Sequence, residues 1–331
     1  METYQQLERE FAEFNGLEPE NMVACSSGAA ALHLACECLN LTGNVVVPEY
    51  TMVACARAVS MTGARPVFID CGDDLNLDPE LLWEHIDSLP VIMGVMAVHI
   101  YGRPCNMERI NRICRHEFSI PSVIEDLAEA HGIKPHINTD AACWSFYKNK
   151  IIAGEEGGAV YFKDKWHAER ARKMRCLGFM NPTDYGFKHY LHEPRGFNYR
   201  MSNAHAELIL KSLHYYHLNL QRRREVEHHY NDLIHPGYRQ PTRRAPWVYD
   251  IKLDGTAQSN VDKVAKALND QGMPVRTGFK PMSMQSEYRG HYRHLRAYEA
   301  SQRIVYLPLD PLLTREQVVG YVGALHEVLG V

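Results

Sequence analysis

Short apolar runs that end in polar residues recur along the first two thirds of the chain, with amphipathic segments between them. The runs lie at residues 22–24, 44–48, 65–70, 91–99, 122–126 and 159–162. Such runs are typical of strands buried on both faces, and the amphipathic segment at 107–116 is typical of a covering helix. This alternation predicts an α/β fold with a mostly parallel central sheet flanked by helices. Ligands bind beyond the carboxyl ends of such strands, so the polar residues there are the candidate functional groups.

A second, smaller unit is expected in the last third of the chain. A helical stretch over residues 208–229 is followed by two segments that interrupt regular secondary structure, His235-Pro-Gly and Arg239-Gln-Pro. A strand at 248–253, a helix at 260–271 and a final helix at 314–329 come next. We therefore predict a large domain over residues 1–225 and a smaller C-terminal α+β domain over residues 226–331.

Composition excludes several classes of protein. The 331 residues are 45% hydrophobic and 23% charged, which argues against a disordered or coiled-coil chain. The longest apolar run, 91–100, is too short to cross a bilayer, and the first residues lack the features of a signal peptide. The nine cysteines include no Cys-x-x-Cys pair, so no metal site is expected. We expect a cytoplasmic protein without a membrane partner.

Charge is distributed unevenly along the chain. The first half is acidic and the second half is basic, including Arg222–Arg224, Arg276 and Lys280. The basic residues of the second half either form solvent-exposed helix faces or contact a phosphate-bearing ligand. Charge alone does not decide between these. No nucleic-acid-binding motif is present, so we expect no nucleic acid partner.

A turn of small residues follows the first predicted strand. Cys25-Ser-Ser-Gly-Ala-Ala-Ala runs into an alanine-rich helix that Ser26 or Ser27 can cap. Gly28 would let a ligand approach the backbone, and the free N–H groups of the helix start would hold a phosphate. The same residues also suit tight strand–helix packing.

Two further segments carry candidate reactive groups. The run 122–126 delivers Glu125 and Asp126 to a strand end, where a carboxylate could hold a protonated ring nitrogen or favour a helix start. Lys148 and Lys150 lie between an aromatic stretch and a glycine turn. An amine held out of water there can form a Schiff base with an aldehyde, although either lysine could also be a surface residue.

These three segments together indicate one cofactor. Pyridoxal phosphate needs a cup for its phosphate, a carboxylate for its ring nitrogen and a lysine for its aldehyde. The chain presents candidates for all three in order, at Gly28, Asp126 and Lys150.

The same segments resemble the DegT/DnrJ/EryC1/StrS sugar aminotransferases, which are fold type I pyridoxal phosphate enzymes. The resemblance extends over essentially the whole chain. Its motifs are Ser27-Gly-Ala-Ala-Ala-Leu-His-Leu, Val98-His-Ile-Tyr-Gly, Ile124-Glu-Asp, Ala130-His-Gly, Ser145-Phe-Tyr-Lys-Asn-Lys with Glu156-Gly-Gly, and Gly196-Phe-Asn-Tyr-Arg-Met-Ser. Ser145-Phe-Tyr-Lys-Asn-Lys and Glu129 are most similar to the perosamine-synthase branch.

The resemblance implies a role for each matched position. Lys150 would bind pyridoxal 5'-phosphate covalently and then shuttle protons, and Asp126 would pair with the ring nitrogen. The phosphate would be held by Ser145 and the turn of Ser27, Gly28, Ala29 and Ala30. Asn198 would reach the cofactor of a neighbouring subunit, which implies a homodimer with shared active sites. Glu129 falls near the phenolic oxygen of the cofactor, where many members have Gln or His.

Some positions depart from the family pattern. Ala29 stands where a threonine hydroxyl usually contacts the phosphate, and Met52 stands where an aromatic ring commonly stacks on the cofactor, a place that Tyr50 could take instead. The connection between Gly132 and Ser145 is also short.

The expected reaction is transamination. An amino acid, by resemblance glutamate, would leave its amino group on the cofactor as pyridoxamine phosphate, which would then aminate a keto group of a nucleotide-linked sugar. The departures leave an alternative open, a decarboxylase or eliminase acting on another amine such as a modified nucleotide. A binding protein on a retired aminotransferase fold is disfavoured, because Lys150, Asp126 and Ser145 are all present.

Overall fold

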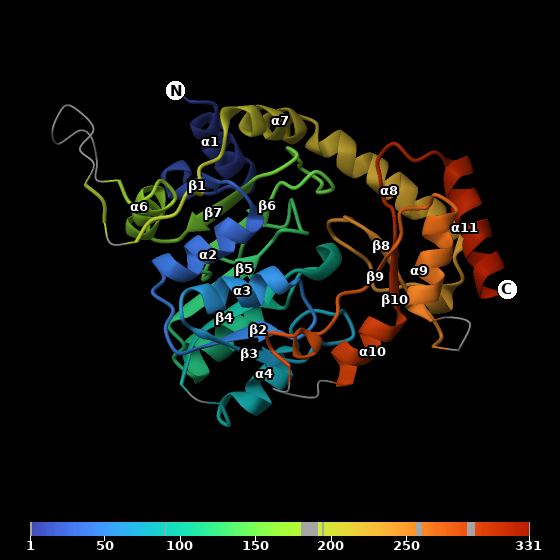
Figure 1. Ribbon diagram of the computed structural model, residues 1–331, viewed down its shortest axis with the longest axis horizontal. Coiled ribbons are helices and arrows are strands. Elements are labelled where there is room, and N and C mark those ends of the chain that lie inside the picture. The colour runs from blue at the N-terminus through green and yellow to red at the C-terminus, as the bar shows by residue number, and fades with distance from the viewer. Residues whose placement is uncertain are drawn as a thin grey trace.

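The computed structural model describes residues 2–89, 91–179, 191–193, 195–255, 260–289 and 295–330. A seven-stranded sheet and a three-stranded sheet occupy opposite ends of the molecule, as Figure 1 shows. The long helix α8 runs from one end toward the other. No helix within the described ranges is long and apolar enough to span a membrane.

The large sheet has the strand order β1-β7-β6-β5-β4-β2-β3. All strands run parallel except β7, which is antiparallel to both of its neighbours. The predicted mostly parallel sheet is therefore confirmed. Its strands are β1 (Met22–Cys25), β2 (Asn44–Pro48), β3 (Arg65–Ile69), β4 (Ile92–Val98), β5 (Ser122–Asp126), β6 (Ala141–Ser145) and β7 (Gly158–Phe162).

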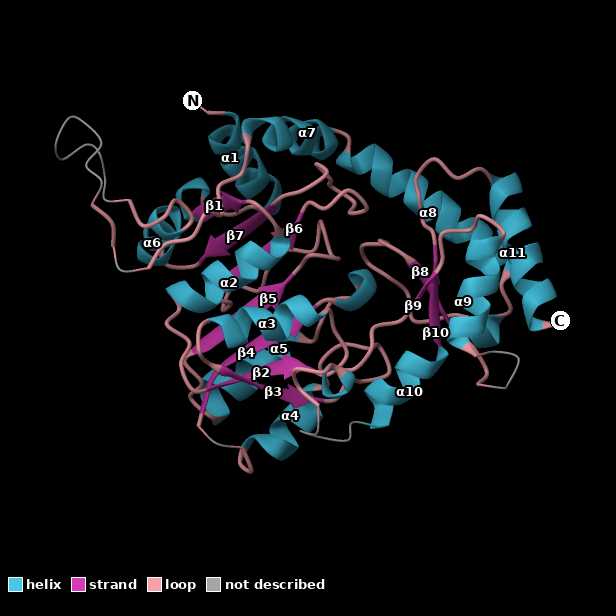
Figure 2. Ribbon diagram, viewed as in Figure 1, coloured by secondary structure: helices cyan, strands magenta, loops and turns pink. Residues whose placement is uncertain are grey.

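Helices cover both faces of this sheet (Figure 2). Alternate strand residues point to opposite sides. Val45 and Val47 of β2 join the core under one set of helices, whereas Val46 joins the core under α4 and α5. The first set consists of α1 (Thr3–Asn15), α2 (Gly28–Cys38), α3 (Val53–Met61), α6 (Lys165–Met174) and α7 (Asn203–His214), and the second of α4 (Pro79–Ile86) and α5 (Met107–Arg112).

The C-terminal unit is a three-stranded antiparallel sheet with its own core. Strand β10 (Ile304–Leu307) lies between β8 (Tyr249–Lys252) and β9 (Arg276–Thr277). Its apolar residues pack against α8 (Tyr216–Leu233), α9 (Val261–Asp270) and α11 (Arg315–Leu329), while α10 (Leu295–Arg303) packs against the large core. The α+β character expected of this unit is confirmed. The predicted domain boundary between residues 225 and 226 lies inside the continuous helix α8. This boundary stays a prediction.

The single helical stretch expected over residues 208–229 is wrong in one respect. The backbone leaves the helix at Tyr215, so α7 ends at His214 and α8 begins at Tyr216. Tyr216 turns into the core, and its hydroxyl donates a hydrogen bond to the His131 carbonyl over 3.1 Å. Apolar periodicity continues across this break and therefore did not reveal it.

Candidate active site

The carboxyl ends of strands β1, β5 and β6 lead into three of the segments singled out from the sequence. Strand β1 leads into Ser27 and Gly28, β5 ends at Asp126, and β6 ends at Ser145. Because β1 and β6 both run antiparallel to β7 and β6 runs parallel to β5, these three ends lie at one edge of the sheet. The structure therefore brings the predicted phosphate turn, carboxylate and lysine loop to one place.

The turn after β1 has the geometry of an anion-binding helix start. Ser27 has an extended backbone, and its hydroxyl accepts a hydrogen bond from the Ala30 amide over 3.1 Å. Ser27, not Ser26, is thus the helix cap. A β-carbon added to Gly28 would lie 2.7 Å from Cβ of Ser145, so only glycine lets these two segments touch. Ala29 is exposed beside them, where the first amides of α2 have no partner within the helix.

Lys150 is the lysine that faces the carboxylates. Its amide donates a hydrogen bond to the Tyr147 carbonyl over 2.8 Å, which closes a turn after β6. Burial lowers the pKa of the Lys150 amine, and the nearby carboxylates of Glu129 and Asp126 act against this shift. Lys148, two residues earlier, is exposed. The structure thus separates two lysines between which local composition alone did not choose.

Asp126 is buried at the end of β5 with neutral hydrogen-bond donors only. Its Oδ1 accepts a hydrogen bond from the Ala128 amide at 2.9 Å, and its Oδ2 accepts one from the Cys55 thiol at 3.2 Å. Burial is the largest influence and raises the pKa of Asp126. Within the described ranges no cation lies at ion-pair distance from this carboxylate, so its charge is open to a cationic ligand.

Glu125 points to the other side of the sheet and is engaged there. Its Oε2 lies 2.9 Å from Nε2 of His99, and its Oε1 accepts hydrogen bonds from the His136 amide and the Thr139 hydroxyl. Burial works to raise the pKa of Glu125, but the hydrogen bonds and the His99 charge outweigh it and the pKa is lowered. Of the two adjacent carboxylates, only Asp126 faces Lys150.

Glu129 is a second buried acid near the lysine. Its Oε2 accepts a hydrogen bond of 2.8 Å from the Tyr101 amide, and Tyr101 has the left-handed φ of 53°. Burial raises the pKa of Glu129 to about 7, although the Lys150 charge lowers it. The site therefore holds an amine and two acids whose pKa values are all displaced, a pattern common at catalytic centres.

Comparison with known proteins identifies the family. The family model described as the DegT/DnrJ/EryC1/StrS aminotransferase family matches residues 2–326. The chain belongs to this family. A GDP-perosamine synthase of Caulobacter vibrioides is 32% identical over 299 residues, with 86% of this chain and 78% of that protein covered.

Two further relatives agree with this assignment. A GDP-perosamine synthase of Escherichia coli O157:H7 is 31% identical over 337 residues, covering 98% of this chain and 89% of that protein. The crystal structure of DesV from S. venezuelae in complex with a ketimine intermediate superposes with a TM-score of 0.85 at 26% identity, covering 99% of this chain and 90% of that chain. The fold type I architecture and the aminotransferase class predicted from the sequence are confirmed.

Membership of the DegT/DnrJ/EryC1/StrS family implies pyridoxal phosphate, and the residues present fit it. The close approach of Gly28 to Ser145 forms a cradle beside the amides of α2 that suits a phosphate. Asp126 offers a buried carboxylate without a cationic partner among the described residues, as a ring nitrogen requires. Lys150 supplies an amine on the same side.

Met52 and Asn198 both have exposed side chains. Met52 precedes α3, and 53% of its side chain is exposed. Asn198 is exposed, and its Oδ1 accepts hydrogen bonds from the guanidinium of Arg200. Neither side chain contacts Lys150 or Asp126 in an interaction that the described residues display. Ser145 accepts a long hydrogen bond, 3.4 Å, from the Tyr147 amide.

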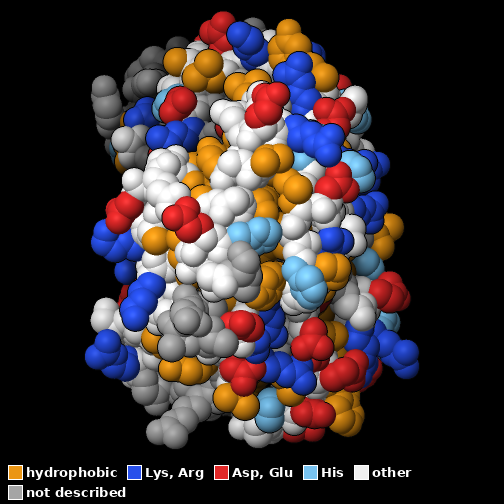
Figure 3. Space-filling model, turned by 90° about the vertical axis from the view of Figure 1, so that its right-hand side faces the viewer, with side chains coloured by type: hydrophobic (Ala, Val, Ile, Leu, Met, Phe, Trp, Pro, Cys, Tyr) orange, Lys and Arg blue, Asp and Glu red, His pale blue; other side chains and the backbone are white. Residues whose placement is uncertain are grey.

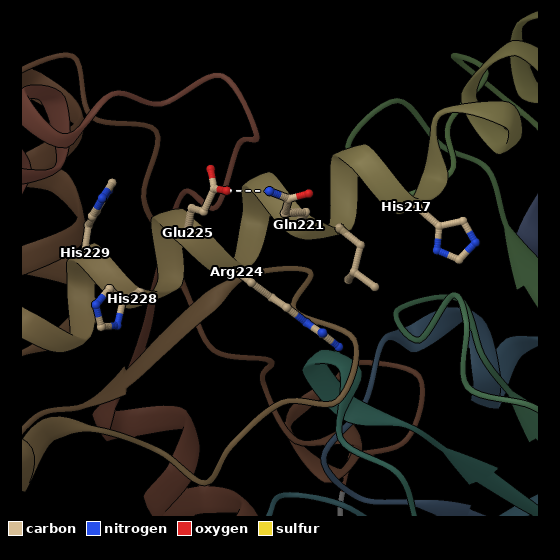
Figure 4. A pocket seen from close by; sticks show the side chains of 7 residues that line it. His217, Gln221, Arg224, Glu225, His228 and His229 are labelled. Atoms are coloured by element: carbon tan, nitrogen blue, oxygen red, sulfur yellow. Dashed lines mark hydrogen bonds between the residues drawn. The ribbon is translucent and has the colours of Figure 1, made fainter.

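The basic half of the chain divides into separate environments. Arg223 is buried, and its Nη1 donates hydrogen bonds to the Trp247 and Leu309 carbonyls, so it binds backbone rather than a phosphate. Arg224 lines a hollow along α8 beside Gln221 and Glu225, whose side chains share a hydrogen bond (Figure 4). Figure 3 shows acidic and basic side chains interspersed on the face at this end of the molecule.

Arg276 of β9 is the member of this basic set that faces the site. Its charge lowers the pKa of the Lys150 amine, although less than burial does, and it also acts to lower the pKa of Tyr306, which burial raises.

The site also contains residues to which the sequence analysis gave no role. The His131 ring stacks on Phe146 at an interplanar angle of 1°, and burial lowers the pKa of His131 to about 3, so this imidazole is neutral. Trp247, Tyr101 and Tyr306 form an aromatic cluster above Lys150. The Ala130-His-Gly motif pointed to His131, but the aromatic cluster joins distant segments and left no local signal.

Proposed function

We propose that this aminotransferase moves an amino group from glutamate to a keto group of a nucleotide-linked sugar, with pyridoxal phosphate bound covalently through Lys150. The observation that carries the proposal is the amine of the half-buried Lys150, which faces Asp126 and Glu129 at the sheet edge that also holds the Gly28–Ser145 contact. When bound, the cofactor supplies an aldehyde that accepts the amino group and a ring that withdraws electrons.

Each site residue then has a task that its surroundings support. Ser27, Gly28, Ala29 and Ala30 would hold the phosphate with Ser145, which fixes the cofactor against α2. Asp126 would keep the ring nitrogen protonated. The positive charge of that nitrogen would offset the free-energy cost of a buried, ionised Asp126 carboxylate. The lowered pKa of Lys150 would leave its amine able to take a proton from the α-carbon of the donor and return it elsewhere.

Glu129 is suited to hold a proton near the phenolic oxygen of the cofactor. The pKa of Glu129 is about 7, so near neutral pH this carboxyl can donate a hydrogen bond in its protonated state. The Tyr101 amide fixes one of its oxygens and leaves the other for the ligand.

The proposed acceptor follows from the relatives and from the charge near Lys150. Both perosamine synthases are named for GDP-linked products. Arg276 lies near Lys150 and could contact the diphosphate of such a substrate. We also propose a cytoplasmic homodimer, since Asn198 is exposed and therefore accessible to the cofactor of a neighbouring subunit.

Borohydride reduction of the pyridoxal phosphate-loaded protein, followed by peptide mass spectrometry, tests the lysine assignment. A pyridoxyl mark on Lys150 is expected, and a mark on Lys148 would contradict the proposal. Glutamate should bleach the cofactor absorbance and yield 2-oxoglutarate, whereas release of carbon dioxide or ammonia alone would exclude transamination. Lys150→Ala should abolish turnover, and the matched surface variant Lys148→Ala should not.

A further inference from the structure

The amine of Lys150 lies against the face of an indole. Its Nζ is 3.7 Å from the ring centroid of Trp247, a residue of the segment that joins α8 to β8. The side chain of Trp247 is only 6% exposed. A cation over an indole face is attracted by the ring quadrupole, and exclusion of water strengthens this attraction.

The indole is fixed from several directions. Its Nε1 donates a hydrogen bond of 2.8 Å to the carbonyl of Asn149, the residue before Lys150. Its backbone carbonyl accepts a hydrogen bond of 2.9 Å from the buried Arg223 of α8. The rings of Tyr101 and Tyr306 pack beside it at centroid distances of 6.3 and 6.2 Å. The position of the ring is therefore set independently of Lys150.

The other groups that face the amine compete with one another. Glu129 and Asp126 attract it from the segment at the end of β5, Arg276 repels it from β9, and the Cys55 thiol faces it from α3. Neither carboxylate lies at ion-pair distance from the amine. Among the charged and aromatic groups in the described part of the chain, the indole face is the one that the amine touches.

We propose that the face of Trp247 is the holding site of the Lys150 amine whenever this amine is not bound to the cofactor. Trp247 is thus a positioning residue that acts through Lys150, and this inference rests on the proposed function. A four-carbon side chain released from its bond would otherwise sample many rotamers or approach a carboxylate. The indole instead keeps the amine close to the place where it is needed next.

The test uses the full-length protein loaded with pyridoxamine phosphate, which leaves the lysine amine free. Wild type, Trp247→Phe and Trp247→Leu are pulse-labelled with acetic anhydride across a pH series, and labelling of Lys150 and Lys148 is measured by mass spectrometry. Leucine excludes water but has no quadrupole, so in Trp247→Leu the ammonium form of Lys150 loses its attraction to the ring. The pKa of Lys150, and with it the pH midpoint of its labelling, should therefore fall by about one unit. The midpoint of Lys150 in Trp247→Phe should lie between those of Trp247→Leu and wild type. The midpoint of the exposed Lys148 should be the same in all three proteins.

Equal midpoints in wild type and Trp247→Leu, or in the Phe and Leu variants, would overturn the holding site. If the leucine variant does not fold, wild-type protein containing fluorinated tryptophans replaces it. Fluorine weakens the quadrupole at nearly constant shape, so the midpoint should fall stepwise with fluorine number, and a constant midpoint would refute the proposal. Trp247→Phe protein grown with the same analogues is the control and should show no steps.

The two proposals fail by different readouts. A borohydride mark on Lys148 removes the proposed function, whereas an unchanged labelling midpoint removes only the role of Trp247.

Discussion

Asp126 and Asp250 are both buried aspartates, but their surroundings differ. Asp250 on β8 receives two hydrogen bonds from Arg103, at 2.7 and 2.9 Å, and another at 2.8 Å from Nε of Arg243. Burial works to raise its pKa, but the two guanidiniums outweigh it and the pKa of Asp250 is lowered. Among the described residues, Asp126 accepts hydrogen bonds from an amide and a thiol but from no guanidinium, so burial prevails and its pKa is raised.

The difference fits the proposal that Asp250 stabilises the fold and that Asp126 binds a ligand. Arg103 follows β4 of the large sheet, whereas Arg243 and Asp250 belong to the C-terminal region, so this ion-pair cluster joins the two units. Its charges are compensated within the protein. Among the described residues no guanidinium pairs with Asp126, so binding of a cation would supply the missing compensation, as expected of the functional carboxylate proposed above.

Replacing Asp126 with Asn should give the largest effect on the reaction. The shape is kept but the charge that would hold the ring nitrogen protonated is lost, so kcat should fall by roughly 10²- to 10³-fold, as when other preorganised electrostatic groups are removed. The rate of 2-oxoglutarate formation from glutamate measures this. The ligand-free variant should be at least as stable as wild type, because a disfavoured buried charge has been removed. If the variant is less stable than wild type, Asp126 stabilises the fold, as Asp250 does, and is not kept for a ligand.

Replacing Asp250 with Asn should have the opposite profile. Two guanidiniums would remain buried without their carboxylate, and breaking such a pair costs about 3–5 kcal/mol of stability. Urea unfolding of the full chain measures the loss. Under conditions where the variant stays folded, the glutamate half-reaction should keep a rate within a few fold of wild type. Loss of activity at unchanged stability would mean that Asp250 belongs to the active site.

The sequence predicted the elements whose signals are local. Strands such as β2 and β5 appear where apolar runs end in polar residues, and the phosphate turn appears where β1 meets an alanine-rich helix. These patterns depend on neighbouring residues, so they are readable before the chain folds. The family resemblance then added roles for Lys150 and Asp126 that periodicity does not contain.

The parts that the sequence left open depend on orientation or on distant contacts. Adjacent carboxylates at a strand end look alike until the pleat directs Glu125 to His99 and Asp126 to the other face. Trp247 meets Lys150, and Asp250 meets Arg103, only because the C-terminal unit docks against the large sheet. No spacing within either segment records that docking.

The pH dependence of stability should distinguish Glu129 from a carboxylate that stabilises the fold. Because the pKa of Glu129 is raised to about 7, the folded protein binds a proton here that the unfolded chain has lost above its ordinary pKa. Stability should therefore fall as pH rises from about 4.5 to 7. In Glu129→Gln this pH-dependent loss of stability, on the order of 2 kcal/mol, should be absent. The measurement is the unfolding free energy of ligand-free wild type minus that of the variant, followed across this pH range. A difference that does not vary with pH would show that this carboxyl is ionised throughout.

The smallest predicted effect concerns the phosphate turn, where Ala29→Thr would add a hydroxyl at the second position of α2. If this turn binds the phosphate, as proposed, the hydroxyl should add one hydrogen bond to it, worth about 1 kcal/mol. The Kd for pyridoxal phosphate, from equilibrium dialysis, should fall roughly fivefold. Ala204→Thr is a matched control, because Ala204 is also exposed at the second position of a helix capped by a serine, Ser202 of α7. Equal effects of both substitutions would assign any gain to the helix start itself, whereas a gain confined to Ala29 would place the phosphate at this turn.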